Sequence, residues 1–237
     1  MYRSGWFPVE IVRKSIKNLH VGVYPRDGRI RVAAPESVSQ DAVRVAILTR
    51  LPWIKRQKIS FEGQAREARR QFVSGETHFV FGRPHRLQVV KGSIRHRLEI
   101  EPDRMFMHAP EDSTAQKRAN YTQSWQRRNL REKAAPRMEE WATSLNLPVP
   151  TWGIRRMKTK WGSCSPDSSQ VWLNLELFKK PLVCLDYVVL HEMAHFVSPK
   201  HDEKFVGVLD KFMPTWRRIR ADLNALPLGH EPSFERS

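Results

Sequence analysis

The sequence has few of the features that mark membrane-embedded, exported or disulfide-stabilised proteins. Among its 237 residues are only two cysteines, Cys164 and Cys184, which are too few for a disulfide framework. No uninterrupted apolar run approaches the roughly 20 residues that span a bilayer. Residues 1–10 lack the basic-then-apolar order of a signal peptide. These absences favour a cytoplasmic protein with reduced thiols and no membrane association.

Acidic side chains are scarce as well, because 25 Asp and Glu stand against 41 Lys and Arg, for a formal net charge of +16. Such a surface attracts polyanions. It favours an anionic substrate, either a nucleotide or an acidic or extended peptide, with nucleic acid as a further partner. The alternative is a solvated basic surface that only keeps the protein in solution, because charge alone does not locate a site.

Residues 1–112 are predicted to form a β-rich domain with one helix. Partly alternating apolar residues predict a hairpin over 19–32, around a turn at 25–28. A helix is expected from the N-cap Ser39 to about Phe61, and Pro52 should kink or split it. Two further strand pairs are expected within 78–90 and 97–108, around turns at 82–84 and 102–103.

From residue 113 the pattern becomes mainly helical. The segment 114–145 has helical periodicity, and Pro136 should break it into two helices. Its many cations between 117 and 137 form either a solvated face or one that meets an anionic partner. We expect the remaining elements to be strands at 154–160 and 171–177 and helices at 181–196, 205–212 and 216–223. The predicted class is therefore α+β, with a second domain over 113–226 and a flexible tail over 227–237.

The sequence His191-Glu192-Met193-Ala194-His195 points to a metal site. Histidines four residues apart share one face of a helix, so both imidazoles can meet one metal ion. Glu192 can reach a metal-bound water without being a ligand. Zinc lowers the pKa of that water toward ~7, and the glutamate accepts its proton. The alternative is a pair of helix histidines that the fold satisfies in other ways.

A catalytic zinc ion needs three protein ligands and one open position. Ser198-Pro199 ends the predicted helix, and a turn there would bring His201 back to the metal. Asp202 and Glu203 lie close by as alternative third ligands. His230 is less suitable because it lies in the predicted tail.

A basic segment precedes this helix, and four cations stand before the predicted turn at 161–162: Arg155, Arg156, Lys158 and Lys160. Cations beside a metal could hold phosphate groups or a carboxylate, unless the strand is simply exposed. The strand that begins at Val171 could bind an extended substrate by edge pairing, or it could be an ordinary core strand. Cys164 has no neighbouring cysteine and is expected to be a small buried hydrophobe.

Several of these segments together resemble the YgjP-like metallohydrolase family, which is similar to the WLM and SprT-like zinc peptidases. The resemblance is carried by residues 155–165, Leu173-Asn174, residues 185–195, His201 and Phe205. The N-terminal hairpin and the helix after it match more loosely. The resemblance implies a minimal zincin-like C-terminal domain with the HExxH helix, behind the β-rich domain. It also implies Zn2+ or another divalent metal, with the ligands and base His191, His195, His201 and Glu192.

The resemblance implies a metal-dependent hydrolase, and a metallopeptidase is the leading prediction. It also implies an alternative, a nucleoside-triphosphate pyrophosphatase that converts UTP to UMP and pyrophosphate. The candidate substrate-binding residues are the four cations and Asn174. A third hypothesis is a nucleic-acid-binding protein with a structural metal. It is weaker because a structural zinc usually has four protein ligands, and only three are visible in the sequence.

Overall fold

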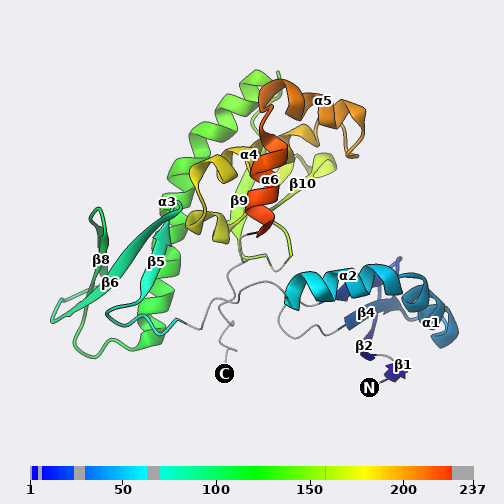
Figure 1. Cartoon of the computed structure of the whole chain (residues 1–237), viewed down its shortest axis with the longest axis horizontal. Coiled ribbons are helices and arrows are strands. Elements are labelled where there is room, and N and C mark those ends of the chain that lie inside the picture. Colours follow the sequence, from blue (N-terminus) through cyan, green and yellow to red (C-terminus); the bar gives the residue numbers. More distant parts are fainter. Residues whose placement is uncertain (1, 5–6, 24–29, 63–69, 158, 226–237) are drawn as a thin grey trace. The chain divides into compact units, whose positions relative to one another are not determined.

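The computed structural model of the chain describes residues 2–4, 7–23, 30–62, 70–157 and 159–225. Contacts divide the protein into two compact units, Met1–Glu67 and Ala68–Ser237. Both units combine helices with a sheet (Figure 1), so the predicted mixed α+β class is confirmed. None of the described helices has both the length and the apolar character needed to cross a membrane.

The N-terminal unit consists of a sheet with the strand order β1-β2-β4-β3 and two helices. Its elements are β1 (Tyr2–Ser4), β2 (Phe7–Lys14), β3 (His20–Val23), β4 (Ile30–Pro35), α1 (Gln40–Thr49) and α2 (Leu51–Glu62). The predicted hairpin is confirmed as the antiparallel pair β3–β4, and its turn lies outside the described residues. Strand β2 was not predicted, although it pairs in parallel with β4 and contributes the buried Val9.

The predicted helix of this unit is confirmed and is split in two. Ser39 caps α1, because its hydroxyl accepts a hydrogen bond from the Ala42 N–H at 3.2 Å. The break falls at Arg50, between the two helices, rather than at Pro52. Pro52 is the second residue of α2, where a missing N–H leaves no intrahelical bond unmade.

The second unit begins with a four-stranded sheet of order β5-β6-β8-β7. Its strands are β5 (Thr77–Val80), β6 (Arg83–Lys91), β7 (Arg97–Ile100) and β8 (Arg104–Ala109). Both predicted strand pairs are therefore confirmed. The turn between β5 and β6 is shorter than predicted, because Arg83 and Pro84 already belong to β6.

One long helix, α3 (Ala115–Ser144), follows this sheet. The predicted break at Pro136 is wrong. The proline side chain is exposed, and the buried Leu130, Ala134 and Met138 hold the helix against the core on both sides of it.

Helix α3 also packs on the sheet, where Trp125 meets the cluster around Leu87 and Met105. Figure 1 shows α3 running from this sheet to the helices α4 and α5. Because helix and sheet share a core, the contacts divide the chain at residue 67, whereas the predicted boundary was residue 112.

The rest of the unit is a three-stranded sheet of order β10-β11-β9 with short helices. Its elements are β9 (Thr151–Arg155), β10 (Gly162–Ser165), η1 (Pro166–Ser168), β11 (Gln170–Asn174), η2 (Leu175–Lys179), α4 (Leu182–Ala194), α5 (Glu203–Phe212) and α6 (Trp216–Ala225). The three predicted helices are confirmed. The predicted strand at 154–160 is wrong beyond Arg155, and residues 175–179 form a 3-10 helix because the Asn174 side chain caps them. Strand β10 was not predicted.

The turn between β5 and β6 contacts the start of α4. The Phe81 N–H donates to the Phe178 carbonyl at 2.8 Å, and the two rings lie 4.8 Å apart. Gly82 has a φ of +84°, and a Cβ there would lie 2.8 Å from the Pro181 ring. A glycine is therefore required by both the backbone conformation and the close approach. This contact joins the four-stranded sheet to the helix that carries the histidine pair.

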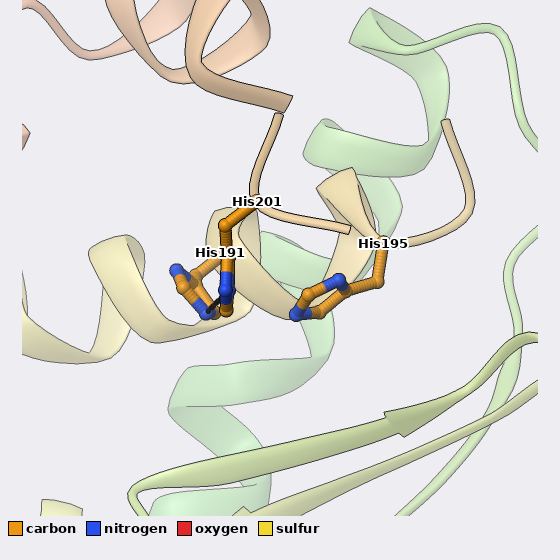
Figure 2. Close-up of side chains that lie close together, drawn as sticks. All are labelled: His191, His195 and His201. Atoms are coloured by element: carbon orange, nitrogen blue, oxygen red, sulfur yellow. Dashed lines mark hydrogen bonds between the residues drawn. The ribbon is translucent and has the colours of Figure 1, made fainter. Parts of the chain in front are cut away.

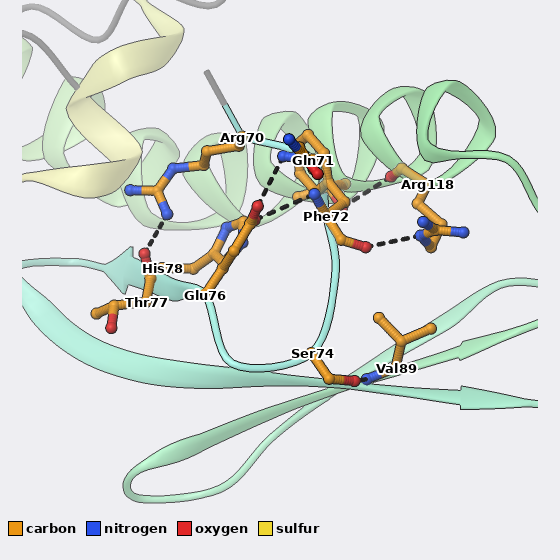
Figure 3. Close-up of polar contacts among 10 residues, drawn as sticks. Arg70, Gln71, Phe72, Ser74, Glu76, Thr77, His78, Val89 and Arg118 are labelled. Carbon is orange, nitrogen blue, oxygen red and sulfur yellow. Dashed lines mark hydrogen bonds and ion pairs between the residues drawn. The ribbon is translucent and has the colours of Figure 1, made fainter. Parts of the chain in front are cut away.

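A polar cluster anchors the segment before β5 (Figure 3). The Glu76 carboxylate accepts hydrogen bonds from the N–H groups of Gln71 and Phe72, at 2.7 and 3.1 Å. Its Oε2 also lies 3.2 Å from Nε2 of the buried His78. The Arg118 guanidinium reaches from α3 and donates to the Phe72 carbonyl at 2.7 Å. The cluster thereby satisfies backbone groups that burial would otherwise leave unpaired.

The buried His78 should make the folded state sensitive to acid. Burial and the Arg70 charge lower its pKa to about 4, although Glu76 opposes this shift. In the unfolded chain the imidazole titrates near its ordinary value of 6.5. As the pH falls from about 6.5 to about 4, the unfolded state binds a proton that the folded state does not, so stability is lost across that window.

We predict that His78→Gln is less stable than the parent protein near neutral pH but loses less additional stability at about pH 5. Urea unfolding at the two pH values measures this difference. The exposed His20→Gln is the control and should keep the parent pH dependence. An unchanged pH dependence in His78→Gln would show that this imidazole does not make folding acid-sensitive.

Candidate metal centre

Helix α4 is buried on almost all sides, which explains why its sequence is apolar around its whole circumference. Its buried apolar residues are Cys184, Leu185, Tyr187, Val188, Val189, Leu190, Met193 and Ala194. The helix contacts α3, α5, α6, β10 and β11. Its C-terminal half, from Tyr187 to the C-cap His195, lines an open cavity.

Three histidines converge at this end of α4 (Figure 2). His191 and His195 come from the helix, and His201 comes from the segment after it. Each offers a ring nitrogen, and the three nitrogens lie within 4.8 Å of one another. The Nε2 atoms of His191 and His201 are 3.2 Å apart. Two ligands at 2.0–2.1 Å from a tetrahedral zinc ion would be separated by about 3.3 Å, so this pair fits such an ion.

The turn that brings His201 back is fixed by the cap of the next helix. Asp202 is the N-cap of α5, and its carboxylate accepts hydrogen bonds from the Phe205 N–H at 3.0 Å and the Ser198 hydroxyl at 2.8 Å. Both oxygens are thus engaged in capping. Among the described residues, the group close enough to share one metal ion includes His201 and neither of the alternatives Asp202 and Glu203.

The Phe205 ring packs against the rings of all three histidines. Its side chain is buried, and its ring centroid lies 5.0 Å from that of His191, 4.8 Å from that of His195 and 4.6 Å from that of His201. The sequence identified Phe205 only through the family resemblance. No local pattern could assign it a role, because the contact depends on how α5 folds back on α4.

The environment keeps the helix histidines neutral, as metal ligands must be. Burial, and then the neighbouring His195 and His201, lowers the pKa of His191 to about 3. Burial and His201 also lower the pKa of His195. The Tyr187 hydroxyl lies 3.3 Å from Nδ1 of His191. A partner for Nδ1 fixes the ring so that Nε2 faces the other histidines.

Glu192 is buried beside this triad and only 6% exposed. Burial raises the pKa of its carboxyl to about 7, against the lowering effects of the Lys160 charge and the Cys164 backbone N–H. A carboxyl that titrates near neutral pH can both accept and donate a proton. A cation bound by the histidines would favour its ionised form.

Strand β10 fits closely around Glu192. A Cβ on Gly162 would lie 2.4 Å from Oε1 and 2.7 Å from Cγ of Glu192, so only glycine leaves room for the carboxyl. Cys164 lies two residues further along. Burial, and then Glu192, raises the pKa of its thiol to about 12. The thiol therefore stays protonated and is not a nucleophile at neutral pH.

The cavity in front of the triad has a volume of about 450 Å³. Besides the histidines and Glu192, it is lined by residues of β10, of the segment before it, and of α6. The polar or charged members that were not predicted as site residues are Thr159, Ser163, Tyr187, Arg220 and Asn224. Arg220 and Asn224 are brought to the site by packing between helices, not by a motif.

The four predicted substrate-binding cations are placed differently from one another. Lys160 lines the cavity. The Arg155 guanidinium lies 4.8 Å from the centre of the Trp172 ring, and Arg156 lies 3.2 Å from the Glu176 carboxylate. Neither arginine lines the cavity. Lys158 lies outside the described residues.

Asn174, the fifth predicted substrate-binding residue, is completely buried. Its amide nitrogen donates to the carbonyls of Met157 and Lys160, at 3.0 and 2.7 Å. Its oxygen accepts from the N–H groups of Met157 and Glu176. The side chain thus shapes the segment that leads to Lys160 and acts on the cavity only through it.

The expected edge strand also differs from the observed one. The strand from Val171 is β11, which lies between β9 and β10 and has both edges occupied. The prediction that this strand could add an extended substrate is therefore wrong. Its neighbour β10 pairs only with β11 among the described strands, and Gly162, Ser163 and Cys164 of β10 line the cavity.

Comparisons with known proteins agree with the family resemblance. A family model described as "YgjP-like, metallopeptidase domain" matches residues 17–226. No curated protein matches the chain. Among solved structures, the chain is similar to the metallopeptidase zymogen jannalysin of Methanocaldococcus jannaschii, with 26% identity over 38% of this chain and 87% of that chain and a TM-score of 0.36. It is also similar to the zymogen abylysin of Pyrococcus abyssi, with 19% identity, 38% and 90% coverage and a TM-score of 0.36.

We predict that Gly162→Ala destabilises the protein by about 1–3 kcal/mol, because the added methyl group overlaps the buried Glu192 side chain. Urea unfolding measures the loss. Gly207→Ala is the matched control, since a Cβ there meets no atom within 4 Å. It should be neutral or slightly stabilising. If both variants were equally stable, the close packing of β10 on Glu192 would be refuted.

We predict that His201→Ala weakens zinc binding more than the roughly 10–100-fold loss caused by removing an outer hydrogen-bond partner of a ligand. Isothermal titration of the metal-free protein with zinc measures the dissociation constant. Glu203→Ala removes a nearby exposed carboxylate and should leave affinity unchanged. The reverse pattern would make Glu203 the third ligand.

Proposed function

Since this chain belongs to the YgjP-like metallopeptidase domain family, we propose that it is a zinc-dependent peptidase. In this proposal His191, His195 and His201 hold the metal ion, and Glu192 is the general base. The supporting observation is the convergence of three histidines and the buried Glu192 on a cavity of about 450 Å³. Three ligands with an open side match a catalytic zinc centre better than a structural one.

Glu192 carries both proton transfers, and the residues around it hold the site in position. A zinc ion, when bound, polarises the scissile carbonyl group and lowers the pKa of a water molecule. Glu192 accepts the proton that water loses as its oxygen attacks the carbonyl carbon, and then gives it to the leaving amine. The Cys164 N–H and Gly162 hold the carboxyl in position for both transfers. Tyr187 fixes the orientation of His191.

An extended peptide suits the wall of this cavity. The edge of β10 away from β11 pairs with no described strand. Apart from the Cys164 N–H, which donates to Glu192, its backbone N–H and C=O groups can add a further strand. Main-chain pairing would hold the substrate backbone alongside Glu192, whichever side chains it carries. We therefore propose β10, and not β11, as the strand that binds substrate.

The structure offers less to a nucleotide pyrophosphatase. That alternative needs the cations of the basic segment to bind phosphate groups at the cavity. Arg155 instead stacks on Trp172, and Arg156 pairs with Glu176. A purely structural metal is also less suitable, because the described residues supply three ligands and not four.

We predict that Glu192→Gln lowers kcat/KM for peptide hydrolysis by about 10²–10⁴-fold, because the amide cannot accept the proton from water. Zinc content should stay at the parent level, since Glu192 is not a ligand. Cleavage of a fluorogenic peptide library by the zinc-loaded proteins measures the loss, with Glu203→Gln as the control that keeps activity. A Glu192→Gln variant with parental activity would move the reaction centre elsewhere.

A further inference from the structure

The cavity is lined by more basic than acidic side chains, apart from its three histidines. Two cations line it, Lys160 from the segment before β10 and Arg220 from α6. Glu192 is the one carboxylate among the described lining residues. Leaving the histidines aside, two cations and one carboxyl group give the lining a formal charge of at least +1 before any metal ion is added. An anionic group is the ligand that such a wall attracts.

The two cations serve different parts of the site. After the larger effect of burial, the Lys160 charge lowers the pKa of Glu192 and, further down the order of causes, that of His195. The Arg220 charge acts instead on the pKa values of Tyr187 and His191. Arg220 belongs to the Tyr187 side of the cavity, because Trp216 of the same helix stacks on the Tyr187 ring, and both Arg220 and Glu192 act on the pKa of Tyr187.

Neighbouring arginines of α6 are paired, which makes Arg220 distinctive. The Arg217 guanidinium binds Asp210, and Arg218 lies 3.9 Å from Asp222 in the next turn. No carboxylate lies within ion-pair distance of Arg220 among the residues that the structure describes.

Helix α6 holds this arginine on a fixed wall. Its buried residues Trp216, Ile219 and Leu223 pack into the core, and the Trp216 ring is stacked on that of Tyr187 at 6.4 Å. Arg220 and Asn224 are four residues apart and both line the cavity, as expected for one face of a helix. The arginine thus projects from a rigid element next to the reaction centre.

We propose that Arg220 is a specificity-determining residue that selects peptides with a carboxylate close to the scissile bond, either a Glu or Asp side chain or the peptide C-terminus. This inference rests on the proposed peptidase function. The planar guanidinium can bind a carboxylate with two parallel hydrogen bonds. A substrate bound along β10 presents alternate side chains to opposite sides, and Arg220 would read one such position.

Binding can be tested without turnover in the full-length Glu192→Gln protein, both zinc-loaded and metal-free. The probes are fluorescent alanine-based peptides that carry a single glutamate at successive positions, each with a glutamine twin, and a separate pair with a free or amidated C-terminus. Fluorescence anisotropy gives their dissociation constants. At one position, or at the free C-terminus, the carboxylate should improve affinity by roughly tenfold.

Substitutions of Arg220 should change that ratio and little else. Arg220→Gln should bring it close to one, Arg220→Lys should retain part of it, and Arg220→Glu should favour a lysine peptide over the glutamate peptide. Arg218→Gln, on the same helix but away from the cavity, should keep the parent ratio. A ratio that survives in Arg220→Gln, or no carboxylate preference at any position, would overturn the inference.

The assay separates this inference from the proposed function. If the zinc-loaded parent protein cleaves peptides but shows no Arg220-dependent preference, the peptidase proposal stands and the specificity proposal fails. If the carboxylate preference is present but no peptide is cleaved, the specificity proposal stands and the peptidase proposal fails. UTP serves as a phosphate probe. Arg220-dependent binding of UTP without any carboxylate preference would overturn the specificity proposal in favour of a phosphate-binding role.

Discussion

The whole site depends on the burial of α4. Packing with two strands and three helices covers most of this helix, and the part that lines the cavity lies in its C-terminal half. A helix C-terminus carries a partial negative charge, which favours a bound cation. The candidate ligands His191 and His195 stand there, one helical turn apart. The apolar residues of the same helix therefore have two effects: they stabilise the core, and they fix the two imidazoles to a few tenths of an ångström, which metal coordination requires.

The buried Glu192, beside the three histidines, constrains the neighbouring strand β10. Glu192 needs a hydrogen-bond donor and enough room, and β10 supplies them through the Cys164 N–H and the missing side chain of Gly162. The path of β10 is set in turn by Asn174, whose amide fixes the segment before it. A residue whose side chain never reaches the cavity thus controls where Lys160 and the edge of β10 lie. An asparagine that looks like a binding residue in the sequence is explained instead by the backbone that it organises.

The sequence predicted those features that local geometry determines. Two histidines four apart on a helix need no tertiary information, and the turn to His201 spans only six residues. Strand β10 was missed because Gly162–Ser165 has no apolar alternation, and it becomes a strand only by pairing with β11. The predicted break at Pro136 was wrong because the effect of a proline on a helix depends on whether its side chain is exposed. The neighbouring residues in the sequence do not reveal this. Phe205 and Arg220 reach the site through helix packing, which no spacing rule predicts.

The charge of +16 is a poor guide to the site, because the fold uses many of the cations. Along α3, Arg118 donates to the Phe72 carbonyl, Arg131 lies over Trp152 and Arg137 pairs with Asp186. The arginines of the basic segment are engaged in the same way. What distinguishes Arg220 is its position, since it lies at a cavity, on a rigid helix and without a carboxylate partner among the described residues. Selectivity for an anion follows from such a local imbalance of charge, which total composition cannot reveal.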